Sequence, residues 1–548
     1  MPPETASRPV RVWWAFAAFC VLKFILVSHD EVITMAWDDL DNARNAQFWH
    51  YGTPYGINAF TKQPGLSLFA GAATVFGLPL RLAYELLWMS ASASVLAALR
   101  TVGVHRSVAL LCSLAVLYHP WTFGLFERFL ADAPYAGWYT LFIGLLTLAA
   151  FAPTTRSALL RALGASVAGA WAINTRPEGA LVYLVPVCVA AAAWFASREK
   201  PARRRAAGVC LLAGAIVFGS AAAAAAGVKA KTGVFMAHEL AMPGFKRLYN
   251  ALLAIEPDHP HAKLPIPRDV RERAYAVSPT LATIREAMEG PTLEAFQPLV
   301  YGDTGVKGEH GAWAVWALRD ATFRVIPVDA VVRAKTYNDF WNKAADEVRA
   351  AIGDGRLPSR WVPISFVQPN WPQLAREAPT SFGRYWKILT RDPVPRAWPA
   401  DVGPDRAPFD LMGLRRLSLV DLREQRPVGP SLWHRPRVHG ALMMIQESLQ
   451  ALYNTVTRYG AWFPLAAFPA LAWLALKGRA ERGPVAILGV LLTLILARLA
   501  LAVLLDACGV WAQHRYVLAI APLVHVALWV SVAGLVSAAL AARRPTPR

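Results

Sequence analysis

The sequence predicts a mainly α-helical, polytopic membrane protein, in which a helical bundle is joined to a large, mostly helical extracytoplasmic domain. Apolar runs near the roughly 20 residues that a membrane-spanning helix needs recur along the chain. Of the 548 residues, 55% are hydrophobic and 17% are charged, whereas a soluble domain carries about 25% charged residues. Lys and Arg gather in alternate gaps between the apolar runs. These observations predict about ten membrane crossings plus one partial helix.

Residues 1–229 are predicted to form an N-terminal transmembrane bundle. Its first span follows basic residues but no small-x-small cleavage pattern, so we expect this span to be retained and not removed as a signal peptide. A shorter apolar piece at 66–80 is expected to be a re-entrant or surface-lying helix. The predicted spans run over 11–28, 82–99, 106–124, 133–152, 157–174, 179–196 and 207–229.

A long hydrophilic block, 230–458, separates this bundle from the C-terminal transmembrane helices at 459–548. Within it, Ser278-Pro279 predicts a helix start. Apolar residues at helical spacing over 328–352 predict an amphipathic helix that Gly353-Asp354-Gly355 ends. Weak periodicity and frequent Pro over about 355–440 predict a mixed, mostly helical domain with long loops. The C-terminal spans are predicted over 460–477, 484–506 and 515–541.

The basic gaps predict the orientation of the protein. If the N-terminus is cytoplasmic, every cluster of Lys and Arg lies on the same side, so both termini are expected in the cytoplasm. The net charge of +19 does not predict a nucleic-acid partner, because no nucleic-acid-binding motif accompanies it. It indicates contact with anionic membrane lipids. The polar segments expected outside are 29–65, 127–132, 174–178 and 230–458.

Two adjacent carboxylates, Asp38 and Asp39, follow the first predicted span in the outer loop 29–65. Acidic groups at a membrane boundary are costly without partners, so the pair is a functional-site hypothesis. The alternative is a helix cap, because Asp favours helix starts. The same loop ends with Lys62-Gln63-Pro64-Gly65, directly before the partial helix.

These motifs resemble the GT-C class of membrane glycosyltransferases, which take sugar from a polyprenyl-phosphate or polyprenyl-diphosphate carrier. In that class an acidic pair follows the first transmembrane helix, as Asp38-Asp39 does here. A Lys-Pro-type motif then leads into the next apolar segment, as Lys62–Gly65 does. Arg128 and Asp132 are similar to an Arg and an acidic residue in the second outer loop of the class.

The chain as a whole is most similar to uncharacterised bacterial members of this class. The shared elements are Arg176-Pro177-Glu178-Gly179 after a membrane helix, an outer segment from Gly308 to Ala321, and the pair Arg515-Tyr516 before the last helix. The resemblance implies a GT-C-like bundle in a bacterial inner membrane, with the large domain in the periplasm. The partners that it implies are a polyprenyl-phosphate-linked sugar donor and a glycan, lipid or protein acceptor of the cell envelope.

The resemblance also implies roles for the site residues in a transfer that is expected to invert the anomeric centre. Asp38 or Asp39 is expected to take the proton of the acceptor hydroxyl as general base. Fixed cations are expected to hold the departing phosphate. The expected phosphate-binding residues are Lys62, Arg128, Arg176 and Arg515, and the supporting residues are Asp132, Glu178 and Tyr516. Some members of the class use a divalent cation, so Mg²⁺ or Mn²⁺ shared by Asp38 with Asp132 or Glu178 is a further hypothesis.

Some of these residue assignments, and the function of the whole protein, have alternative interpretations. Arg128 and Asp132, four residues apart, also fit a structural helix pair. Arg515 also fits an anchor at the lipid headgroups. For the whole protein, a transporter or flippase for a lipid-linked glycan would use the same cations without chemistry, although internal repeats and broken helices are not evident in the sequence. A non-catalytic membrane scaffold is the third interpretation.

Overall fold

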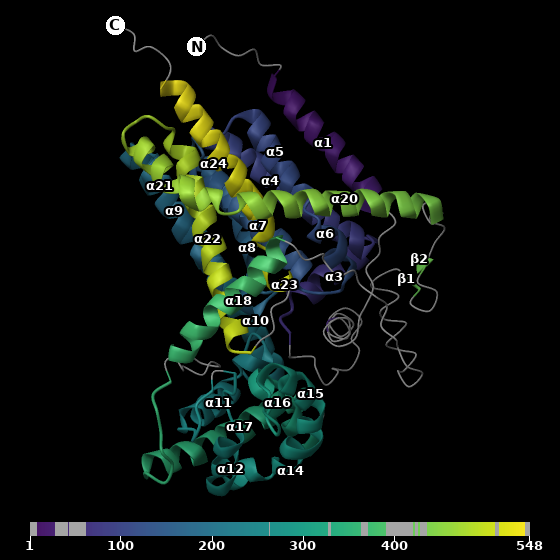
Figure 1. The fold of residues 1–548 in the computed structure, drawn as a ribbon, viewed down its shortest axis with the longest axis vertical. Coiled ribbons are helices and arrows are strands. Elements are labelled where there is room, and N and C mark those ends of the chain that lie inside the picture. The colour runs from purple at the N-terminus through teal and green to yellow at the C-terminus, as the bar shows by residue number, and fades with distance from the viewer. Residues whose placement is uncertain are drawn as a thin grey trace.

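Helices make up almost all of the structure, a computed structural model that describes residues 8–27, 42, 62–261, 263–326, 330–362, 371–390, 420–421, 426–427, 436–509 and 514–542. Long apolar helices form a bundle, and shorter helices form a second cluster beyond one end of it (Figure 1). The prediction of a mainly α-helical membrane bundle joined to a mostly helical domain is confirmed.

The N-terminal helices follow the predicted spans closely. The partial helix predicted at 66–80 is α3, whose 11 residues are too few to cross a bilayer. The span predicted at 179–196 begins as a 3-10 helix and continues as a short α-helix. The elements are α1 (Arg8–Val27), α3 (Gly65–Val75), α4 (Leu80–Thr101), α5 (Arg106–Leu117), α6 (Trp121–Gly124), η1 (Leu125–Glu127), α7 (Asp132–Ala150), α8 (Thr155–Ile173), η2 (Pro177–Tyr183), α9 (Leu184–Ala196) and α10 (Lys200–Thr232).

The second cluster lies around helix α17 (Ala330–Gly353), which was predicted over 328–352 and ends before Gly355 at φ 72°. The predicted helix start at Ser278 is also confirmed, because the Ser278 hydroxyl accepts from the Leu281 amide at 3.0 Å. The other elements here are η3 (Glu239–Ala241), α11 (Pro243–Ala254), α12 (Arg268–Val277), α13 (Pro279–Ala282), α14 (Arg285–Ala287), the π-helical turn η4 (Met288–Thr292), α15 (Leu293–Thr304), η5 (Gly311–Trp313) and α16 (Ala314–Val325).

This cluster has a hydrophobic core of its own, separate from that of the bundle. Trp341 of α17 is fully buried in it and meets the ring of Phe245 edge-on at 4.8 Å. Its indole N–H donates to the Thr322 hydroxyl at 3.1 Å, so the polar atom of this large side chain is satisfied inside the core. An independent core of this kind is what a separate domain needs.

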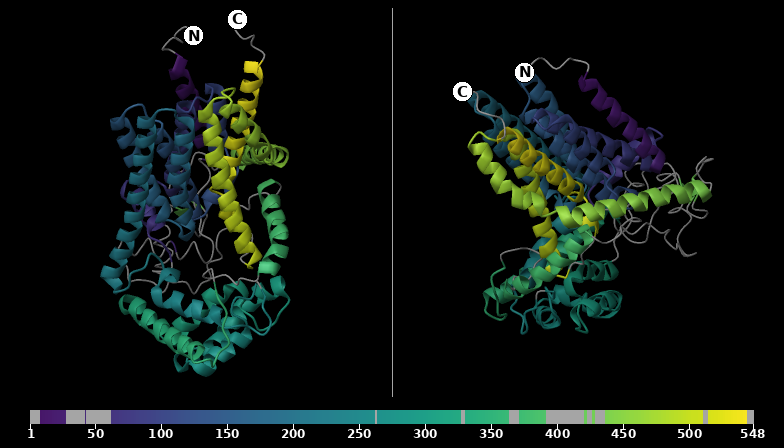
Figure 2. Two further views of the ribbon diagram at one scale, coloured as in Figure 1. Left: turned by 90° about the vertical axis from the view of Figure 1, so that its left-hand side faces the viewer. Right: turned by 45° about the horizontal axis from the view of Figure 1, so that its top comes forward.

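The C-terminal elements return to the bundle. Helix α18 (Trp371–Thr390) buries Tyr385, Ile388 and Leu389 among the bundle's core residues, and α20 (Pro436–Gly460) lies across the bundle and projects beyond it (Figure 2). The span predicted at 515–541 is interrupted by a turn at 518–520. The remaining elements are β1 (Val420–Asp421), β2 (Arg426–Pro427), α21 (Phe463–Leu476), α22 (Arg482–Ala507), α23 (His514–Val517) and α24 (Ala521–Ala542). The predicted domain boundaries at 229 and 459 stay predictions.

Six helices in the described part of the chain are long and apolar enough to cross a membrane. They are α4, the segment that α5 and α6 form together, α7, α10, α22 and α24; the pair α20–α21, bent by 53°, makes a seventh if it counts as one span. The predicted number of about ten crossings stays a prediction. Helices α8 and α9, both predicted as spans, are not among the six. Helix α8 carries Arg156 and Arg161, and α9, with 13 residues, is shorter than a span needs to be.

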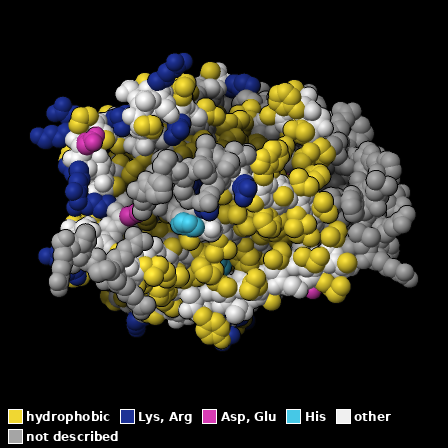
Figure 3. All heavy atoms as spheres, turned by 90° about the horizontal axis from the view of Figure 1, so that it is seen from above, with side chains coloured by type: hydrophobic (Ala, Val, Ile, Leu, Met, Phe, Trp, Pro, Cys, Tyr) yellow, Lys and Arg dark blue, Asp and Glu magenta, His cyan; other side chains and the backbone are white. Residues whose placement is uncertain are grey.

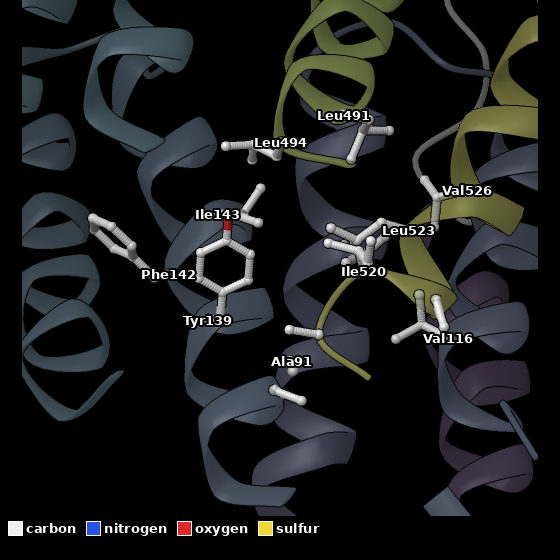
Figure 4. Packing of buried hydrophobic residues seen from close by; sticks show 14 of the residues in the cluster. Ala91, Val116, Tyr139, Phe142, Ile143, Leu491, Leu494, Ile520, Leu523 and Val526 are labelled. Carbon is white, nitrogen blue, oxygen red and sulfur yellow. The ribbon is translucent and has the colours of Figure 1, made fainter. Parts of the chain in front are cut away.

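The bundle is held by close packing of helices from both ends of the chain. Tyr139 of α7, Leu491 of α22 and Ile520 before α24 all belong to one hydrophobic core in the interior (Figure 4). Small residues let the backbones approach: a Cβ on Gly144 of α7 would lie 2.1 Å from the Ser94 hydroxyl oxygen of α4. Because lipid tails are as apolar as these side chains, tight packing is what stabilises such contacts in a membrane.

Helix α1 begins and helix α24 ends on the same side of the bundle, opposite the second cluster (Figure 1). Seen from that side, Lys and Arg side chains gather mainly at the left and upper edges, hydrophobic side chains cover much of the rest, and acidic side chains are sparse (Figure 3). This distribution is typical of a cytoplasmic face. The assignment of that face to the cytoplasm stays a prediction.

Candidate functional site

Asp132 and Arg176 form a buried ion pair between two segments that the sequence placed outside. Asp132 lies in the first turn of α7, and Arg176 is the residue before η2, in an extended conformation with φ −140°. Their side chains are 3% and 10% exposed. The structure therefore brings together two predicted site residues, and it gives Asp132 a partner other than Arg128, the neighbour that the spacing suggested.

Two of the four predicted phosphate-binding cations, Arg176 and Arg515, meet at Tyr516. The guanidinium of Arg176 lies over the Tyr516 ring at 5.8 Å, and that of Arg515 lies over the same ring at 5.3 Å. Both distances fit cation–π contacts, which orient a guanidinium without neutralising it. The short helix α23 carries Arg515 and Tyr516, so the turn that interrupts the last predicted span positions both residues.

A third guanidinium, that of Arg498 in α22, reaches the same point. Its Nε donates to the main-chain carbonyl of Tyr516 at 2.6 Å, and its Cζ lies 5.9 Å from the centre of the Tyr135 ring. Arg498 is 4% exposed. Sequence reasoning missed this residue, although a charged residue inside the apolar run 484–506 was the available signal.

The motif Lys62–Gly65 packs against the segment that leads to Arg176. The Gln63 side-chain amide donates to the Ile173 carbonyl at 3.1 Å, and the Gly65 amide donates to the Asn174 carbonyl at 2.7 Å. A Cβ at position 65 would lie 2.5 Å from that carbonyl oxygen, so the close approach requires glycine. Lys62, half-buried, is thereby held three residues from the contact with Asn174.

The segment that carries Arg128 is hydrogen-bonded to Asn42, three residues after Asp39 in the sequence. The Asn42 side-chain amide, 4% exposed, donates to the carbonyl of Phe129 at 3.1 Å. Arg128 itself is half-buried at the end of η1. Asp38 and Asp39, the predicted general base, and the side chain of Glu178 lie outside the described residues.

A second buried charged cluster, also missed from the sequence, lies between α1 and α4. The ammonium of Lys23 lies 3.7 Å from the Glu85 carboxylate, which also pairs with Arg81 at 2.9 Å. Lys23 donates to the Thr122 hydroxyl at 2.7 Å, and Arg81 donates to the Thr122 carbonyl at 3.2 Å. Lys23 and Glu85 are fully buried. Four polar side chains from α1, α4 and α6 thus come together inside the bundle.

Among the residues that the structure describes, no three His, Cys, Asp or Glu side chains come together as metal ligands. The carboxylates that the hypothesis of a divalent cation needs, those of Asp38 and Glu178, are not among these residues. Asp132, the third carboxylate of that hypothesis, pairs with Arg176. The use of Mg²⁺ or Mn²⁺ stays a prediction.

No protein-family model matches the sequence, and no curated protein matches it. Among solved structures, the chain is similar to ArnT from Cupriavidus metallidurans in the apo state, with 15% identity and a TM-score of 0.32, over 95% of this chain and 78% of that one. ArnT bound to undecaprenyl phosphate gives 14% and 0.32 over the same shares. The apo oligosaccharyltransferase of Archaeoglobus fulgidus gives 12% and 0.40, over 99% of this chain and 54% of that one. Values this low assign neither activity nor ligand to this chain.

Proposed function

We propose that the protein is a membrane glycosyltransferase that moves a sugar from a polyprenyl-phosphate carrier to a cell-envelope acceptor. The observation that carries the proposal is the convergence of Arg176, Arg498 and Arg515 on Tyr516, with Asp132 beside them. Several guanidinium groups held together within a membrane bundle are suited to a lipid-linked phosphate, because guanidinium binds phosphate oxygens with paired, charge-assisted hydrogen bonds.

Cations of this kind favour the bond-breaking step. When the bond between the anomeric carbon and the phosphate oxygen breaks, negative charge grows on the departing phosphate, and positioned cations stabilise it. The acceptor oxygen forms the new bond to the anomeric carbon from the opposite face, which inverts the configuration. Its proton passes to a carboxylate. The polyprenyl phosphate is then the second product.

We assign the general base to Asp38 or Asp39. Asp39 precedes Asn42 by three residues in the sequence. Asn42 is bonded to Phe129, next to Arg128 and three residues from Asp132. The acidic pair therefore lies only a few positions along the sequence from a residue that contacts the Arg128 segment, which supports a role in the same reaction.

The transporter alternative has one observation in its favour, the 53° bend between α20 and α21. Broken helices in transporters line a substrate path near the middle of the membrane. Helix α20 instead lies across the bundle and projects beyond it (Figure 2), with Met444 and Leu452 exposed. Its bend is better explained by an amphipathic helix at the membrane surface than by a transport path.

The experiment is an assay of sugar transfer in nanodiscs that contain the full-length protein and polyprenyl-phosphate donors carrying radiolabelled sugars. The variants are Asp38→Asn, Asp39→Asn and the double variant, and the matched control is Asp41→Asn in the same loop. We expect the double variant to lose at least about 100-fold of the transfer rate, since a general base contributes about 10²–10⁴-fold, while D41N keeps the parent rate. Unchanged transfer by the folded double variant would contradict the assignment. Flipping of a lipid-linked glycan without transfer in the parent would favour the transporter.

A further inference from the structure

Arg498 stands out because it places a charge inside an otherwise apolar membrane helix. It lies in α22, which matches a membrane span in length and composition, nine residues before the last residue of that helix. At 1.5 Å per residue this is roughly 13 Å from the helix end. The side chain is 4% exposed. An ionisable residue in such a place is rare and requires a compensating partner.

Among the described residues, no contact of Arg498 compensates its charge. Its Nε is satisfied by the Tyr516 carbonyl at 2.6 Å, and the Tyr135 ring lies 5.9 Å from its Cζ. Its Nη1 is buried without a hydrogen-bond partner, and no carboxylate lies within 4 Å of it, among the residues described in the structure. The buried carboxylates of Asp132 and Asp506 pair with Arg176 and Arg384 instead.

A purely structural role does not account for this arrangement. One hydrogen bond to the Tyr516 carbonyl would join α22 to α23, and a neutral donor can make that bond. A guanidinium in the same place adds a desolvated positive charge and an unsatisfied N–H group, and both are unfavourable. An anion that binds at Nη1 would remove both costs at once. The geometry thus favours a ligand with negatively charged oxygens.

We propose that Arg498 binds the phosphate group of the polyprenyl-phosphate carrier, together with the cations that meet at Tyr516. The inference rests on the proposed function and extends it to a residue inside the membrane helix. Arg176 and Arg515 approach the ring of Tyr516, whereas Arg498 approaches its main chain. A phosphate held at this point would be reached by donors from three separate segments of the bundle. The apolar surroundings of α22 suit the prenyl chain that such a phosphate carries.

The test is a binding measurement on the full-length protein in neutral phosphatidylcholine nanodiscs. Three ligands are compared: a polyprenyl phosphate, inorganic phosphate and phosphatidylglycerol. We expect Arg498→Gln to raise the Kd for polyprenyl phosphate on the order of 10- to 100-fold, the range for loss of a hydrogen bond to a charged group. Arg498→Lys, which keeps the charge, should lose less. The matched control is Arg482→Gln, which removes a charge from the other end of the same helix and should keep the parent Kd.

The ligand-induced rise in Tm separates binding from folding. The parent, R498K and R482Q should all be stabilised by polyprenyl phosphate, and R498Q should not. A parent Kd in folded R498Q would overturn the role of Arg498. If R498Q does not fold, a Kd of R498K raised as much as 100-fold would overturn it too, because the retained charge should preserve most of the binding.

The ligand series identifies the source of the phosphate. Equal affinity for inorganic phosphate or for phosphatidylglycerol would overturn the assignment to the lipid carrier. A parent that transfers sugar while R498Q binds the carrier normally would refute this inference alone. A parent that binds no polyprenyl phosphate would refute the inference and the proposed function together.

Discussion

Asp132 and Arg176, 44 residues apart in the sequence, form a buried ion pair that joins the first turn of α7 to the corner before η2. The pair fixes the guanidinium of Arg176 over the ring of Tyr516. Through this contact, and through the hydrogen bond of Arg498 to the Tyr516 carbonyl, α7, the corner before η2, α22 and the short α23 share one polar cluster. The residues of this cluster contact one another, so substituting one of them should change the effect of substituting another.

Removing one partner of this pair should be more costly than removing both. Asp132→Asn leaves Arg176 buried without its carboxylate, which we expect to destabilise the protein by about 3–5 kcal/mol. The double variant Asp132→Asn/Arg176→Gln should lose less free energy of unfolding than the two single variants lose together, because each single variant already removes the same ion pair. Thermal unfolding in detergent would measure these differences.

The control for that cycle is an exposed pair. Arg247 and Asp346 are 41% and 62% exposed and lie 2.5 Å apart in the second cluster. Asp346→Asn should change stability by less than about 1 kcal/mol, as is usual for surface ion pairs. Additive effects of the Asp132 and Arg176 variants would refute the coupling.

Gly65→Ala should disturb the position of Lys62. The added Cβ would lie 2.5 Å from the Asn174 carbonyl oxygen and the Thr175 hydroxyl oxygen, so the segment must shift. We expect about 1–3 kcal/mol of destabilisation from overpacking and a higher KM for the lipid donor. Gly208→Ala in α10 is the control, since no atom lies within 4 Å of its added Cβ. Equal behaviour of G65A and G208A in Tm and KM would contradict the close approach.

Lys62→Gln should weaken the use of the donor without unfolding the protein. A half-buried lysine that binds a phosphate contributes a charge-assisted hydrogen bond, so kcat/KM should fall on the order of 10- to 100-fold. The matched control is Lys335→Gln in α17, whose exposed side chain pairs with Asp339 at 2.9 Å. Steady-state transfer with varied donor concentration would show the effect. A parent-like kcat/KM for K62Q would remove Lys62 from the phosphate site.

The second cluster should lose stability in mild acid because of His310. This side chain is fully buried, and burial, helped by the nearby charge of Arg271, lowers its pKa to about 3. The unfolded chain binds a proton near pH 6.5 and the folded chain does not, so stability falls as the pH drops from about 6.5 toward 3. The expected slope is about 1.4 kcal/mol per pH unit below 6.5.

The His310 contribution is measured as a difference between variants. Glu309 acts in the opposite direction just above pH 4.5, because burial raises its pKa. Comparing thermal unfolding of the parent and His310→Gln between pH 5 and 7 cancels that contribution. H310Q should flatten the slope, whereas His259→Gln, at an exposed position, should leave it unchanged. Identical slopes for the parent and H310Q would contradict the lowered pKa.

Periodicity and hydropathy predicted much of the architecture. The apolar spans, the helix start at Ser278 and the amphipathic helix α17 depend on neighbours a few residues apart, which the sequence displays. Helix α18 was not predicted, because Pro is frequent around it and its packing on α22 is a long-range contact. The last span was predicted as one helix, but a turn at 518–520 separates α23 from α24.

The sequence predicted several residues of the site but not which of them form ion pairs. Spacing suggested Arg128 as the neighbour of Asp132, but the observed partner is Arg176, which comes from a different segment. Arg498 was overlooked because one charge hardly changes the mean hydropathy of a long apolar run. The cluster of Lys23, Arg81 and Glu85 was also overlooked. Its residues come from two separate spans, so their contact is not visible in the sequence.

The most direct test of the account is a structure of the full-length protein in nanodiscs with bound polyprenyl phosphate. The account predicts that the phosphate lies next to Tyr516, within salt-bridge distance, about 4 Å, of the guanidinium groups of Arg176 and Arg498. A phosphate bound instead at the opposite end of the bundle, for example beside Arg11 and Arg106, which line a cavity of about 350 Å³ between α1 and α5, would contradict it.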